Sequence, residues 1–157
     1  MNKKAINLDS ELCMRTCRKI LDKNSEANLA TDYPEKERVV IIVVTVAGII
    51  DNGGFHSLFS SVLPGDPQYI HTMEAFKQIG CSKALDSIKE ALSLFSNANP
   101  PDDDKLRIKL YEKNPKKLRD KIDSKFWKEY DNVSKCLANY IRTNKLSNEF
   151  NGTGLFK

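Results

Sequence analysis

Few residues in this chain carry side chains suited to acid–base or metal chemistry. The two histidines, His56 and His71, lie on either side of Asp66, and a fold that brought the three together could create a general base or part of a metal site. No metal-binding spacing such as HExxH accompanies them. We keep an enzyme with a site near His56, Asp66 and His71 as the second of two alternative hypotheses. The sequence singles out no catalytic residue, no metal ligand set and no cofactor.

The four cysteines indicate the redox state of the protein's compartment rather than a catalytic role. Cys13 and Cys17 lie one helical turn apart, whereas Cys81 and Cys136 are isolated. The first residues include two lysines but no apolar stretch typical of a secretory signal. We therefore predict a cytoplasmic protein with reduced thiols that belong to its core.

The stretch DNGGF, residues 51–55, could be a hairpin turn, a phosphate-binding loop or a corner between two helices. Neither GxxxxGK[ST] nor GxGxxG occurs there, which disfavours a phosphate loop. The apolar residues that follow recur with a helical period, whereas neither alternating set is consistently apolar; they are Phe55, Leu58, Phe59 and Val62. The pattern predicts a corner between two helices, with Gly53 or Gly54 at positive φ.

The element before this corner contains the longest apolar run of the chain, Val39–Ile50. Strands usually have 4–8 residues and a bilayer span needs roughly 20, so this run predicts a buried core helix and no membrane partner. Asp32, Pro34 and Glu35 precede it in the order that favours a helix start. Both sides of the corner are therefore expected to be helical.

Apolar spacing predicts further helices along most of the chain. We expect one from Ser10, as its N-cap, to about Lys23, and one capped by Asp66 with Pro67 in its first position and Gly80 at its end. Others are expected after Ser82, around 106–110, over 118–130 and over 131–141. With 40% hydrophobic and 29% charged residues, the chain is typical of a globular protein.

The sequence therefore predicts an all-α fold with a single compact domain of about seven or eight helices. Within it we distinguish an N-terminal helix and connector (1–31), a helical domain (32–145) and a tail (146–157) expected to be mobile. No internal repeat or separate linker interrupts this organisation.

Charge is unevenly distributed. The net charge is +4, yet residues 105–145 hold 13 Lys and Arg against 5 Asp and Glu. A basic segment of this kind could contact nucleic acid, which gives the first alternative hypothesis, a nucleic-acid-associated protein that uses residues 105–145. The candidate basic contact face comprises Lys116, Lys117, Arg119, Lys121, Lys125 and Lys128.

Several segments together resemble a known family. They read YPEKERVVIIVVTVAGIIDNGGFHSLFSS, MEAFKQIG, PDDDKLRIKL and LRDKIDSKFWKEYDNVSKCLANYI. Over residues 32–142 the chain resembles the small bacterial domain family named for DNA-mimic protein nineteen, whose most specific mark is the NGGF corner. The matching positions are Asn52, Gly53, Gly54 and Phe55, then Ala75, Phe76, Ile79 and Gly80, then Arg107 and Leu110, and finally Asp123, Phe126 and Trp127.

This resemblance implies an all-helical domain with a protein partner, dimer formation, and no established enzymatic activity. For the name-giving member it also implies mimicry of DNA by surface carboxylates. A mimic needs a dense negative face, whereas this chain is basic over 105–145. Our leading hypothesis is therefore a non-enzymatic protein-interaction domain, regulatory or immunity-like, with a binding or structural corner at Asn52, Gly53, Gly54, Phe55 and Asp66.

Overall fold

The computed structural model describes residues 7–147, and all regular secondary structure within them is helical. Seven α-helices and two short 3-10 helices follow one another. They are α1 (Leu8–Lys23), η1 (Ala30–Asp32), α2 (Glu35–Ser60), α3 (Ile70–Gln78), α4 (Ser82–Leu92), η2 (Ser96–Ala98), α5 (Asp104–Glu112), α6 (Lys116–Lys128) and α7 (Tyr130–Thr143). The all-α prediction is confirmed.

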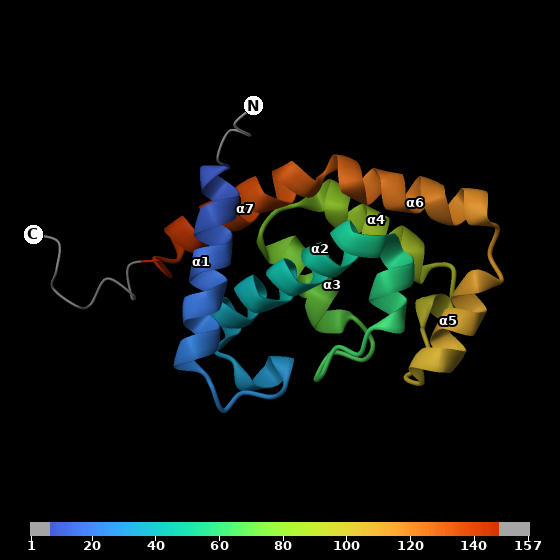
Figure 1. Ribbon diagram of the computed structural model, residues 1–157, viewed down its shortest axis with the longest axis horizontal. Helices are drawn as coiled ribbons and strands as arrows, with labels where there is room; N and C mark the ends of the chain where they lie inside the picture. Colours follow the sequence, from blue (N-terminus) through green and yellow to red (C-terminus); the bar gives the residue numbers. More distant parts are fainter. Residues whose placement is uncertain (1–6, 148–157) are drawn as a thin grey trace, which may run out of the picture.

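The central element is α2, which runs diagonally through the molecule and then turns sharply (Figure 1). It contacts α1, α3, α5, α6 and α7, because its apolar run offers hydrophobic side chains on nearly every side. By length and composition α2 could cross a membrane. Half of its most apolar window is nevertheless buried by the other helices, as expected of the core helix of a globular domain.

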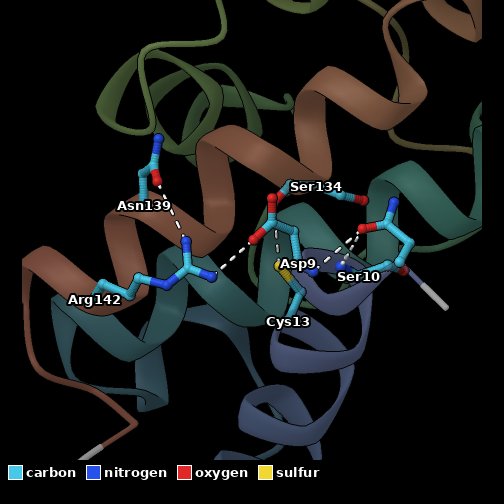
Figure 2. Close-up of polar contacts among 7 residues, drawn as sticks. Asp9, Ser10, Cys13, Ser134, Asn139 and Arg142 are labelled. Carbon is cyan, nitrogen blue, oxygen red and sulfur yellow. Dashed lines mark hydrogen bonds and ion pairs between the residues drawn. The ribbon is translucent and has the colours of Figure 1, made fainter.

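Two polar contacts hold α1 against α7, which crosses it at the left of Figure 1. Arg142 Nη2 lies 2.7 Å from Asp9 Oδ1, and the Cys13 thiol lies 3.4 Å from the carbonyl oxygen of Ser134 (Figure 2). The N-cap of α1 is Asn7, whose Oδ1 accepts the N–H groups of residues 9 and 10. The prediction of Ser10 as the cap was wrong, because the helix begins one turn earlier.

The shorter helices are ended by local chemistry that the sequence indicated in part. The Asp66 carboxylate caps α3, as predicted. Pro67, however, is not the first residue of the helix, because α3 begins only after Tyr69, which has φ 58°. Gly80 ends α3 at φ 74°. Val62 was expected on the buried stripe after the corner, yet it is 69% exposed because the helix ends at Ser60.

An aromatic cluster fills the core between the second part of α2 and α5. The Phe59 ring is fully buried and lies edge-on to three other rings at centroid distances of 4.9–5.6 Å. They belong to Tyr69, Phe95 and Tyr111. Of the predicted tail, Leu146 is buried against the core, and residues 148–157 lie outside the described part of the chain.

Candidate functional site

The corner in α2 depends on one of its two glycines. Gly53 has φ −162°, an extended conformation that any residue adopts, whereas Gly54 has φ 67° and ψ −165°, which strongly favours glycine. A Cβ atom on Gly54 would also collide with the Asp123 carboxylate. The sequence left open which glycine takes positive φ, and the structure assigns it to Gly54.

The corner divides α2 into two parts, and side chains of α6 cap the two helix ends that face the corner. The Phe55 N–H donates to Asp123 Oδ1 at 2.8 Å, and the Trp127 indole N–H donates to the Ile50 carbonyl oxygen at 2.9 Å. Asp123 and Trp127 lie one turn apart on α6. A break inside a helix leaves amide and carbonyl groups without helical partners, and α6 supplies a partner to each side of this break.

Asp123 is 9% exposed, and the surroundings of its carboxylate act on its pKa in both directions. Burial raises the pKa, and the Asp120 carboxylate adds to this effect. The hydrogen bond from Phe55 opposes it, as do the charges of Arg119 and His56. A buried acceptor on a helix N-terminus is the arrangement of a structural cap, which also suits the helix dipole.

The predicted corner residues do not share one surface. Phe55 is fully buried and packs edge-on against Phe126, at a centroid distance of 5.9 Å. Asp66 is 3% exposed and binds the backbone of α3 and the Thr72 hydroxyl, at 2.6–2.9 Å. Asn52 and Gly53 are exposed, so they alone among the five predicted corner residues are available to a partner.

The second alternative hypothesis, an enzyme, required the side chains of His56, Asp66 and His71 to lie together in one site. The His56 ring instead lies 2.8 Å from Glu112 on α5, while the His71 side chain lines a small pocket with Arg38 and Glu74. The Asp66 carboxylate accepts three hydrogen bonds from α3. These different partners leave the three side chains no common centre. Within residues 7–147, no group of three or more histidine, cysteine or acidic side chains could hold a metal ion.

The cysteines are free thiols, and three of the four are buried. Burial raises the pKa of Cys13 to about 12 and that of Cys17 to about 11. Burial, with the neighbouring Cys136 thiol as a smaller cause, also raises the pKa of Cys81 to about 12. All three are therefore protonated near neutral pH, which suits packing rather than nucleophilic chemistry.

Sequence reasoning missed the role of Arg107. The residue is 3% exposed, and its guanidinium donates to the carbonyl oxygens of Phe59 and Ser61, at 2.7 and 2.8 Å. It also donates to the carbonyls of Pro101 and Asp102. Arg107 thereby ties the end of α2 to the loop before α5. Two signals in the sequence marked this position: its match to the family pattern, and its place one turn before Tyr111, which is expected on the buried side of a helix. Neither signal indicated the carbonyl partners.

The predicted basic residues of α6 fall into two groups. Three are engaged within the fold: Lys116 with Asp120, Lys125 with Glu90, and Arg119 with the Asn114 carbonyl and the Tyr111 ring. The other three lie together on the solvent side of the helix and are exposed. They are Lys117, Lys121 and Lys128.

A further surface lies on the outward side of α2. Six uncharged residues share one side of this helix at spacings of three and four, and they are exposed or half-buried. This α2 face consists of Ile41, Val44, Thr45, Gly48, Ile49 and Asn52. It lies between two pockets. One, of about 170 Å³, is bounded by Leu29, Tyr33 and Pro64, and the other, of about 210 Å³, by Met14 and Tyr130.

One of the comparisons with known proteins gives a match. The family described as DMP19-like protein matches residues 31–144, which is well over half of the chain, so the chain belongs to that family. The resemblance seen in the sequence is thereby confirmed. No curated protein and no solved structure matches.

Proposed function

We propose that this member of the DMP19-like family is a non-enzymatic protein-interaction domain with a regulatory or immunity-like role, and that it associates with a second copy of itself through the α2 face. The observation that carries the proposal is the α2 face itself. It is an uncharged helix surface between two pockets in a chain with 29% charged residues. Uncharged, partly apolar surface of this kind is typical of interaction sites.

The shape of the α2 face supports a second copy as its occupant. Gly48 leaves open space where other residues would place a side chain, so another helix could approach closely there. The half-buried Val44 and Ile49 lie on either side of this gap along the helix. A small residue beside branched apolar ones lets two identical faces interdigitate.

Charges at the rim of the α2 face support a two-fold arrangement. Arg38 lies at the end near η1 and donates to the carbonyl oxygens of Ala30 and Tyr33. Asp51 lies at the opposite end and lines the pocket beside α1 and α7. A two-fold axis through the middle of the face brings Arg38 of each copy near Asp51 of the other. Isologous interfaces are self-complementary in this way.

The same proposal places the protein in the cytoplasm, where its four thiols stay reduced. Mimicry of DNA is not part of the proposal. The surface helices α5 and α6 of this protein carry many lysines, whereas a DNA mimic needs carboxylates at such positions.

Sedimentation velocity of the full chain over a range of concentrations tests this function. Thr45→Glu should weaken self-association at least about tenfold, because an unpaired carboxylate buried in an interface costs more than about 1.4 kcal/mol. Thr143→Glu, at an exposed threonine of α7, is the matched control and should leave association unchanged. A wild-type chain that stays monomeric at every concentration, or association that Thr45→Glu does not weaken, would refute the proposal.

A further inference from the structure

A second surface, independent of the α2 face, lies on α5 and α6. Lysines stand at every fourth position from Lys105 to Lys121, first on α5 and then, after the break at residues 113–115, on α6. On α6, Lys128 shares the side of the helix that carries Lys117 and Lys121. Six of these lysines are exposed. We name them the lysine ridge: Lys105, Lys109, Lys113, Lys117, Lys121 and Lys128.

The charges of the lysine ridge are not neutralised within the fold. Across residues 7–147, no carboxylate forms an ion pair with any of the six. The acidic residues between the first and last lysines of the ridge have other partners or are buried: Glu112 contacts His56, and Asp120 contacts Lys116. Asp123 is buried at the corner. The ridge therefore presents an excess of positive charge to solvent.

The arrangement of the ridge suits an extended anion. α5 and α6 form the end of the molecule opposite α1, and α6 follows its outer edge (Figure 1). Within each helix, the ridge lysines that are four residues apart, Lys105 and Lys109 on α5 and Lys117 and Lys121 on α6, are separated by about 6 Å along the axis. Duplex nucleic acid carries one charge per about 1.7 Å of its axis, so successive lysines can each meet a phosphate.

The ridge offers no free arginine or aromatic ring to read bases or to anchor a protein. The one exposed aromatic ring of these two helices, Trp127, is 44% exposed, but it lies on the side of α6 that faces α2, where its indole N–H bonds to the Ile50 carbonyl. Neither arginine of these two helices is available, because Arg107 is buried and Arg119 lies over the Tyr111 ring. Base readout and stacking on single strands rely on arginine forks and exposed aromatic rings. Protein interfaces rely on buried aromatic or arginine anchors. A ridge of lysines alone fits a phosphate backbone best.

We propose that the lysine ridge binds the phosphate backbone of duplex nucleic acid without sequence preference. The acidic residues Asp102, Asp103 and Asp104 precede Lys105, so the strongest contacts fall between Lys109 and Lys128. This binding does not require the α2 face.

Fluorescence anisotropy with labelled DNA duplexes of two unrelated sequences tests the proposal. The full chain should bind both duplexes equally at low salt, and log K should fall with log salt at a slope of up to about −5, or −0.9 for each phosphate neutralised. Replacing Lys109, Lys117 and Lys121 together by Gln should reduce the steepness of this slope by about 3. All three are exposed, so unfolding of the variant is not expected, and a urea titration checks this point.

The matched control replaces Lys36, Lys77 and Lys83 by Gln, at exposed positions on α2, α3 and α4. It changes the net charge equally and should leave the slope unchanged. Absence of binding at low salt would overturn the proposal, as would an equal loss in the control. Binding to polyglutamate but not to duplex DNA would assign the ridge to an acidic protein and also overturn it.

Discussion

At the scale of single residues, the hydrogen bond between Phe55 and Asp123 can be tested by two substitutions. Asp123→Ala leaves the buried Phe55 N–H without an acceptor, and we expect a loss of about 1–3 kcal/mol in the free energy of unfolding. Asp123→Asn keeps an acceptor oxygen in place and removes a charge that burial disfavours, so it should lose less. Urea titration measures both. An asparagine variant as unstable as the alanine variant would contradict the assigned role.

The same carboxylate gives a pH dependence with a defined sign. The pKa of Asp123 is raised above 3.8 in the fold, so the folded state favours the protonated form. The stability that this group contributes is therefore present below its unfolded pKa and is lost as pH rises through the folded value. The stability of the wild type relative to Asp123→Asn should fall with rising pH across that window, as measured by urea titrations between about pH 3.5 and 7.

At the scale of the element, the shape of α2 depends on Gly54. Gly54→Ala introduces a Cβ at positive φ against the Asp123 carboxylate, and we expect it to destabilise the fold by about 2–4 kcal/mol. Gly53→Ala is the matched control. Its φ of −162° suits alanine, and its Cβ meets mainly the Ser57 hydroxyl, which can rotate away. Similar denaturation midpoints for the two variants would show that Gly54 is not the determining residue.

The elements also show what sequence alone can predict. The helical period after the glycines indicated the corner correctly, because periodicity is a local signal. Periodicity could not indicate which residues cap the corner. Asp123 and Trp127 lie 68 and 77 positions from the groups they bind, and no local pattern specifies such pairings. The role of Arg107 was missed for the same reason, since its four carbonyl partners come from two separate segments.

At the scale of the whole molecule, the corner joins α2 to α6, and we expect the described domain to unfold as one unit. Trp127 is the single tryptophan of the chain, and it is bound to α2 at Ile50. Its fluorescence should therefore change at the same urea concentration as the helical circular dichroism signal. A fluorescence transition at clearly lower urea would mean that α6 separates before the rest of the domain unfolds.

The whole molecule also presents two different surfaces. The α2 face is uncharged, whereas the lysine ridge on α5 and α6 carries six exposed cations. The sequence indicated the basic segment but not which of its residues are free to bind a partner. Only the fold shows that Lys116, Lys125 and Arg119 are engaged within the domain. The α2 face belongs to a run in which nearly every residue is apolar. Periodicity therefore could not distinguish the outward side of this helix from its buried side.

The cap that Asp123 and Trp127 place on the corner has a consequence for the order of synthesis. A ribosome makes both parts of α2 well before it reaches α6, so the amide of Phe55 and the carbonyl of Ile50 emerge without their partners. Until residue 127 has left the exit tunnel, neither of these two hydrogen bonds can hold the angle at Gly54. The nascent chain therefore completes the cap on its central corner only after most of the domain has been translated.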